Sequence, residues 1–290
     1  MNISVSNKYL KIFWASLILF SCTERIDIHT DSQEFARLVV EGSISTDTTA
    51  HMVKLTTTAD YFDDRPPRPV SGAQVTIVSE TDSFLLTETP AQSGIYLTEP
   101  DVFGKIGQEY RLQIQLEEEI GGARDFEASS KIFPINQIDS IALQFNEEWG
   151  DEGFVEVKCY VWDPPTEDFY MFHTYINGQL TNDTINRIFV VDDILYNGNY
   201  TNGIGVSYLD QSNSREELKT GDTVTLRAGR ITKEFMEFIN QLQDETGYQT
   251  PVFSGPPANV HGNISNGAFG FFGAFSLSYA SVVVPDLFEQ

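Results

Sequence analysis

Side chains that could carry chemistry are scattered along this sequence of 290 residues. The four histidines, His29, His51, His173 and His261, stand apart, and no HExxH motif or paired His/Cys spacing for zinc occurs. No GxSxG motif or glycine-rich phosphate loop occurs either, so neither a serine hydrolase nor a nucleotide-binding enzyme is indicated. We therefore predict no catalytic residues. A hydrolase with an unfamiliar site stays open, with His173 and His261 as its candidates.

Pairs of neighbouring acids offer oxygen ligands for a hard cation such as Ca²⁺. The pairs are Asp63-Asp64, Asp151-Glu152 and Asp192-Asp193, and none has the spacing of an EF-hand loop. Adjacent side chains on a strand point to opposite faces, so each pair would need partners from elsewhere in the fold. We predict no cofactor and no metal site, with structural calcium as the alternative.

Aromatic residues beside Asn, Gly and Pro are the candidates for ligand binding. They are Tyr196, Tyr200, Tyr208, Tyr248 and Phe253. Exposed rings next to amides suit stacking on a sugar or a peptide, and such rings are common at protein interfaces. The alternative is that these rings fold back and hold long loops in place. The ligand itself is left open.

Cys22 ends the segment that decides where the chain is expected to lie. Lys8 and Lys11 precede an apolar run over 12–20. This order is typical of a secretory signal, and the run is shorter than the roughly 20 residues of a membrane-spanning helix. The sequence Leu19-Phe20-Ser21-Cys22 resembles the lipobox of bacterial lipoproteins, in which the cysteine becomes the lipidated first residue. An ordinary cleaved signal with an incidental cysteine is the alternative.

The expected processing leaves an acidic chain. We predict a signal peptide over 1–21 and a lipidated Cys22 with a tether over 22–35. Residues 1–21 contain two lysines and no acid, so the formal charge would move from −24 to −26. Nucleic acid is excluded as an expected partner, because a phosphate backbone needs clustered Lys and Arg. Cys159 would then have no intrachain disulfide partner, and its alternating sequence predicts a small, buried apolar side chain.

Alternating apolar and polar residues predict a first β-rich domain over 36–133. Strands are expected at 37–44, 52–58, 73–79, 84–88, 94–97, 109–116 and 126–133. Short strands separated by frequent turns favour a β-sandwich.

A second β-rich domain with one amphipathic helix is predicted over 134–290. Strands are expected at 138–145, 153–162, 169–176, 187–191, 223–228 and 268–284, with a long loop over 192–210. Apolar residues at helical spacing predict the helix over 232–245, between Thr232 as N-cap and Gly247 as the stop. The predicted fold class is therefore mainly all-β.

The order of several short motifs resembles a known family. The motifs are LVVEGSI at 38–44, TADYF at 58–62, VSGAQVTI at 70–77, GIY at 94–96, GQEYRL at 107–112, GNI at 262–264 and GFF at 270–272. With the lipobox, they resemble the domain-of-unknown-function outer-membrane lipoproteins of Bacteroidota whose genes lie beside TonB-dependent receptors. The range 36–133 is also similar to carboxypeptidase-regulatory and transthyretin-like β-sandwiches of immunoglobulin type.

This resemblance implies a lipid-anchored outer-membrane protein, exposed at the cell surface, whose partner is a TonB-dependent β-barrel receptor in nutrient uptake. It supplies no catalytic residues. We therefore expect a non-enzymatic accessory that helps capture or retain a substrate. The alternative is a stand-alone surface adhesin or a glycan- or peptide-binding module, which the aromatic loops would suit.

Overall fold

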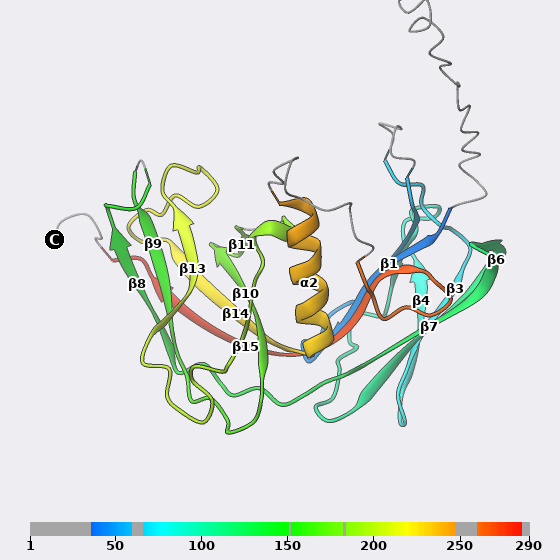
Figure 1. The fold of residues 1–290 in the computed structure, drawn as a ribbon, viewed down its shortest axis with the longest axis horizontal. Helices are drawn as coiled ribbons and strands as arrows, with labels where there is room; N and C mark the ends of the chain where they lie inside the picture. Colours follow the sequence, from blue (N-terminus) through cyan, green and yellow to red (C-terminus); the bar gives the residue numbers. More distant parts are fainter. Residues whose placement is uncertain (1–35, 60–65, 151, 182–183, 248–259, 286–290) are drawn as a thin grey trace, which may run out of the picture. The chain divides into compact units, whose positions relative to one another are not determined.

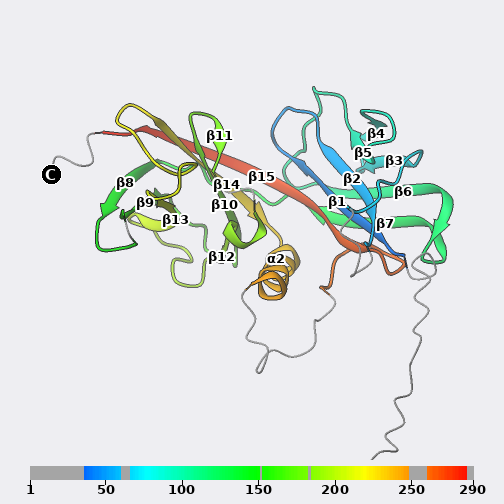
Figure 2. The ribbon, with the colours of Figure 1, turned by 90° about the horizontal axis from the view of Figure 1, so that it is seen from above.

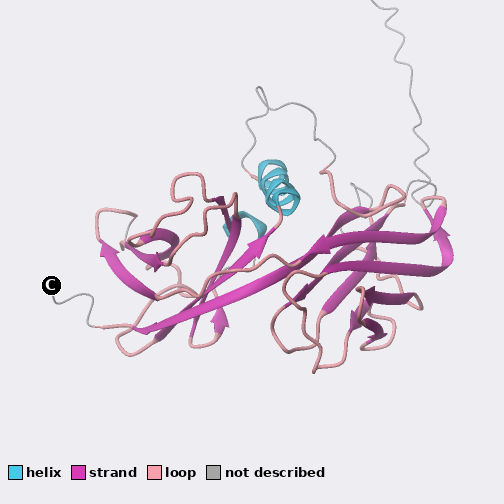
Figure 3. Ribbon diagram, turned by 90° about the horizontal axis from the view of Figure 1, so that it is seen from below, coloured by secondary structure: helices cyan, strands magenta, loops and turns pink. Residues whose placement is uncertain are grey.

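The computed structural model describes residues 36–59, 66–150, 152–181, 184–247 and 260–285. These residues form fifteen β-strands, a short 3-10 helix η1 (Ile185–Arg187) and one α-helix, α2 (Lys233–Thr246) (Figure 1). Figure 3 shows the helices in cyan and the strands in magenta. The predicted all-β class with a single helix is confirmed. The predicted signal peptide, Cys22, Tyr248 and Phe253 lie outside the described residues.

One long sheet holds twelve of the strands. They are β1 (Leu38–Ser45), β2 (Met52–Thr57), β3 (Gln74–Val78), β4 (Ser83–Glu88), β5 (Ile95–Leu97), β6 (Glu109–Ile120), β7 (Ala123–Lys131), β10 (Phe169–Ile176), β11 (Gln179–Leu180), β12 (Phe189–Asp192), β14 (Thr223–Ile231) and β15 (Phe269–Val283). The order is β11-β10-β14-β15-β1-β2-β5-β4-β3-β6-β7, and β12 pairs with β10.

A second sheet of three strands packs against the later part of the first. It contains β8 (Ser140–Asn146), β9 (Phe154–Tyr160) and β13 (Ile204–Asp210), in the order β13-β9-β8. Val155, Val157 and Cys159 of β9 meet Leu226 and Ala228 of β14 in one apolar core. Cys159 is buried as predicted, and burial raises the pKa of its thiol to about 12.

The first core follows the alternation that predicted its strands. In β6, Tyr110, Leu112, Ile114 and Leu116 are buried, while the residues between them are exposed. β6 runs four residues beyond the predicted end. After a register shift that follows Gln115, Ile120 pairs with Ala123 of β7 just before the turn at Gly121. The predicted strand over 126–133 is β7, which starts and ends earlier than expected.

β15 belongs to both cores. It pairs in parallel with β1 and antiparallel with β14, and Figure 2 shows it running between them. On one face, Phe272 and Ala274 are buried in the first core, whereas Ala280 and Val282 pack against the second. This confirms that the apolar segment over 268–284 is a strand with a distant partner. The division of the chain after residue 133 stays a prediction. β15 lies in the second predicted range, but it also packs in the core of the first.

α2 covers the opposite face of β15. Thr232 caps its N-terminus by accepting a hydrogen bond from the Phe235 backbone N–H at 3.2 Å, as predicted. The rings of Phe235 and Phe238 lie 5.0 and 5.2 Å from the ring of Phe271. Within the described residues, no helix has the length and apolar character needed to cross a membrane.

The predicted loop over 192–210 is wrong in its last third. Ile204–Asp210 forms β13, which pairs with β9 through a register shift between Gly205 and Ser207. The glycines and the register shift weaken the alternation of apolar and polar residues in this segment, so its sequence did not indicate a strand. Pairing with β9 nevertheless makes it one.

Gly270 makes the parallel pairing of β1 and β15 sensitive to substitution. Its φ is +97°, and a Cβ at this position would lie 1.9 Å from the carbonyl oxygen of Val40. We expect Gly270→Ala to lower the free energy of unfolding by about 3 kcal/mol or more, from backbone strain of about 1–2 kcal/mol together with the clash. Urea denaturation measures this change.

Gly107→Ala is the matched control, because Gly107 has a φ of +86° and a Cβ added there would meet no atom within 4 Å. It should show the strain alone, about 1–2 kcal/mol. Equal losses in the two variants would contradict the close approach of β15 to β1.

Candidate functional site

A cavity of about 300 Å³ lies between the two sheets of the second core. β9 and β13 form one wall, and β10, β12 and β14 form the other. Its apolar lining comes from Ile135, Ile138, Cys159, Val161, Phe172, Phe189, Val191, Ile204 and Ala228. Its polar lining comes from Asn136, Asp163, Tyr170, Asp192, Asp193, Tyr196, Thr201 and Tyr208. The cavity is thus mainly apolar, with acids and hydroxyls gathered from the strand ends and the following loop.

The structure brings two of the predicted aromatic candidates to this cavity. Tyr196 and Tyr208 line it. Tyr200 does not, and its ring lies 5.4 Å from that of Trp162 instead. Their role in ligand binding stays a prediction. Tyr208 lies beside the cavity because β13, which carries it, pairs with β9. The alternation in the sequence predicted β9 but not β13.

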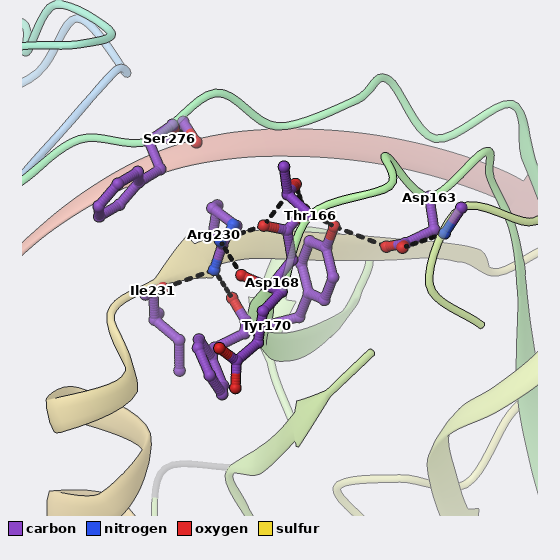
Figure 4. Close-up of polar contacts among 11 residues, drawn as sticks. Asp163, Thr166, Asp168, Tyr170, Arg230, Ile231 and Ser276 are labelled. Atoms are coloured by element: carbon purple, nitrogen blue, oxygen red, sulfur yellow. Dashed lines mark hydrogen bonds and ion pairs between the residues drawn. The ribbon is translucent and has the colours of Figure 1, made fainter. Parts of the chain in front are cut away.

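Arg230 is a buried cation beside the cavity that the strand prediction missed. It continues the inward face of β14 after Leu226 and Ala228, and it is only 6% exposed. Its guanidinium donates to the carbonyl oxygens of Phe169, Ile231 and Glu167 at 3.2, 2.9 and 3.0 Å. It also forms an ion pair with Asp168 (Figure 4). Its inward position in the alternating pattern of β14 was a signal that the sequence offered. A charged residue at such a buried position is seldom unpaired, so it indicates a buried partner.

Three buried aspartates meet next to Arg230. Asp163, Asp168 and Asp193 can each place a carboxylate oxygen within 4.8 Å of the others. Asp163 follows β9, Asp168 precedes β10 and Asp193 follows β12, so three strand ends converge. The backbone supports this convergence, since the Asp193 N–H donates to the Asp168 carbonyl oxygen at 3.1 Å. We call these three residues the aspartate cluster.

The partners of the aspartate cluster differ. Asp163 accepts from the Tyr170 hydroxyl at 2.9 Å and from the Gly198 N–H at 3.3 Å (Figure 4). Asp168 accepts from the Thr166 hydroxyl at 3.1 Å in addition to its ion pair. Burial and the charge of Asp193 raise the pKa of Asp163 to about 6, although the bonds from Tyr170 and Gly198 oppose the rise. The environment therefore disfavours negative charge at Asp163.

Of the predicted acid pairs, Asp192-Asp193 finds partners from elsewhere in the fold. Only Asp193 joins the aspartate cluster, whereas Asp192 accepts from the Ile194 N–H at 3.3 Å. Asp63, Asp64 and Asp151 lie outside the described residues. The cluster offers carboxylate oxygens, which suit a hard cation rather than a soft transition metal.

The histidine candidates lie away from the cavity lining. His173 sits on β10 and is 9% exposed. Burial, helped by the nearby Arg227, lowers its pKa to about 4, so its imidazole is neutral at pH 7. His261 is exposed, and its backbone N–H donates to the Gln241 side chain at 3.1 Å. The hydrolase alternative is therefore not strengthened by the cavity.

Removing the charge of Arg230 should destabilise the fold strongly. Arg230→Met would leave Asp168 buried without its ion-pair partner, and breaking a buried pair costs about 3–5 kcal/mol. The double variant Asp168→Asn/Arg230→Met should recover at least about 1 kcal/mol, because no buried charge is left uncompensated. Urea unfolding of both variants measures this. A double variant less stable than Arg230→Met would contradict the pairing.

One family model matches residues 23–279, which include the whole cavity lining and the aspartate cluster. The comparison with curated proteins finds no match. The matched range covers most of the chain and confirms the predicted membership of an uncharacterised domain family. The chain belongs to the family described as Domain of unknown function (DUF4249).

Proposed function

We propose that this chain is a non-enzymatic binding protein that holds a small, largely apolar ligand in the cavity between the sheets. The cavity itself is the observation that carries the proposal. Its volume, about 300 Å³, lies at the lower end of the range typical of ligand sites, about 300–1,000 Å³. Its lining, mainly apolar with a few polar groups, is also typical of such sites.

The lining indicates the kind of ligand. Phe172, Phe189, Val191 and Ile204 supply apolar surface against which an aliphatic or aromatic body can pack. Tyr196 and Tyr208 combine an apolar ring with a hydroxyl that can orient a polar group. We infer that the ligand is compact and carries its polar atoms at one end.

The binding protein is proposed to be an outer-membrane lipoprotein, anchored through Cys22, that assists a TonB-dependent receptor. The basic-then-apolar segment before Cys22 and the order of the short motifs support this proposal. Surface display and a role in nutrient uptake follow from the same resemblance. The acidic balance of the chain, with a formal charge of −24, is consistent with a partner that is a protein rather than a nucleic acid.

Exposed apolar side chains beside the cavity support a protein partner. Trp162, Ile194 and Leu195 are 61%, 77% and 82% exposed. Ile194 and Leu195 belong to the loop that also brings Asp193 and Tyr196 to the cavity. Large apolar side chains that stay exposed often mark an interaction surface. A receptor that bound here would contact the loop bordering the ligand.

A stand-alone adhesin or a glycan- or peptide-binding module is the second candidate. The paired rings of Trp162 and Tyr200 favour it, because exposed aromatic rings can stack on a sugar. Saturable glycan binding that is lost in Trp162→Ala, together with no saturable ligand binding in the cavity, would favour this candidate over the first.

The cavity proposal is tested with N-phenyl-1-naphthylamine, a neutral apolar amine whose fluorescence rises in an apolar site. Ala228→Leu places three further carbons in the cavity lining, so we expect its affinity for this probe to fall at least about tenfold. Ala142→Leu is the matched control, because Ala142 lies on β8 and does not line the cavity. Circular dichroism confirms that both variants are folded. Non-saturable binding, or equal affinities in both variants, would contradict the proposal.

A further inference from the structure

We propose that the aspartate cluster, Asp163, Asp168 and Asp193, binds a divalent cation of the calcium class. Asp163 and Asp193 also line the cavity, so the cation would lie at its acidic border. This inference goes beyond the proposed function, because the cation site would exist whether or not the cavity accepts an organic ligand.

The spacing of the carboxylate oxygens suits a calcium-sized ion. Ca²⁺ keeps its oxygen ligands about 2.3–2.6 Å away, so two ligands on opposite sides of the ion are about 4.6–5.2 Å apart. One oxygen from each of the three aspartates lies within 4.8 Å of the others. All three could therefore contact one ion without a rearrangement of the strands that carry them.

The described side chains at the aspartate cluster lack two positive charges for electrical balance. Asp163, Asp168 and Asp193 are 7%, 3% and 4% exposed, and buried carboxylates need compensation. Arg230 supplies one positive charge, and it is already held against Asp168. Three carboxylates and one guanidinium carry a net charge of −2, which a single divalent cation neutralises.

Asp193 provides the independent indication of a ligand. Its Oδ2 atom is buried and accepts no hydrogen bond from an N–H or O–H donor of the described residues, and its carboxyl lies within hydrogen-bond reach of the Asp163 carboxyl. By contrast, Asp163 and Asp168 each accept hydrogen bonds from the protein. A buried acceptor without a partner destabilises the folded state, and more so when it is charged. A bound cation removes this destabilisation and also relieves the repulsion between Asp163 and Asp193.

The position of the site indicates what the cation would do. Asp163 and Asp168 lie in the loop between β9 and β10, whereas Asp193 comes from a separate segment that follows β12. A cation bound to all three would add a further link between the two segments, which backbone bonds from Asp193 to Asp168 and from Asp163 to Asn199 already join. It would hold the loop that carries Tyr196 against the cavity. Calcium binding should therefore raise the thermal stability of the protein.

Calorimetric titration of the full chain with Ca²⁺, after removal of metals with EDTA, tests the proposal. We expect one saturable site with a Kd at or below about 1 mM, the range of extracellular calcium modules. Asp193→Asn should weaken binding at least about tenfold, because the side chain loses its charge and one strong ligand oxygen. Asp125→Asn is the matched control, since Asp125 is an exposed acid of β7 outside the cluster, and its affinity should not change.

Terbium luminescence locates the bound ion without depending on a cluster variant. The Tyr170 hydroxyl lies 2.9 Å from Asp163, close enough for the ring to sensitise a Tb³⁺ ion held by the cluster. Tyr170→Phe should remove most of this emission, and excess Ca²⁺ should displace the emitting ion from the unsubstituted chain. If Asp193→Asn does not fold, the terbium measurement decides whether the aspartate cluster binds the ion.

The opposite results would overturn the cation site. No saturable Ca²⁺ binding up to about 10 mM, well above the weakest usual calcium modules, would mean that the carboxylates share a proton instead. Equal affinity in Asp193→Asn and Asp125→Asn, or emission unaffected by Tyr170→Phe, would place the ion elsewhere. Probe binding in the cavity is measured separately, so failure of this site and failure of the proposed function are distinguishable.

Discussion

The pairing of β15 with both β1 and β14 is the constraint on which the rest of the described structure depends. One face of this strand supplies Phe272 and Ala274 to the first core and Ala280 and Val282 to the second. Its other face receives α2 through Phe271. Since apolar burial is the main stabilising term of folding, neither core is complete without this strand. We infer that the two cores gain stability together.

The same pairing places the candidate site. β14 is held between β15 and β10, and this position brings Arg230 beside the start of β10, where Asp168 lies. β12 then pairs with β10 and carries Asp193 to the same place. Charged groups from three separate segments, the β9–β10 loop, the end of β12 and β14, therefore meet at one border of an apolar cavity. Such a combination of a mainly apolar lining and a few converging polar groups is typical of a binding site.

Local sequence patterns were sufficient to predict strands and the helix, but not which of them lie side by side in the fold. The alternation in β6 and the helical spacing with the Thr232 cap depend on neighbours within a few residues, and both predictions are confirmed. The aspartate cluster depends on which strands pair across the chain, and no local pattern contains that information. Arg230 was visible as a charge at an inward position, yet its partner Asp168 became evident only from the register of β10 and β14. The register shift in β13 likewise concealed a strand within a predicted loop.

The proposed role of this chain, a binding protein that works beside a TonB-dependent receptor, is open to a direct measurement. That measurement is affinity purification of the tagged, naturally processed protein from mildly solubilised membranes of its own cell, with mass spectrometry of the proteins that accompany it. We predict one TonB-dependent β-barrel in near-stoichiometric amount, and lipid on Cys22. Purification of the protein alone, with no barrel enriched over a control lipoprotein, would contradict this role.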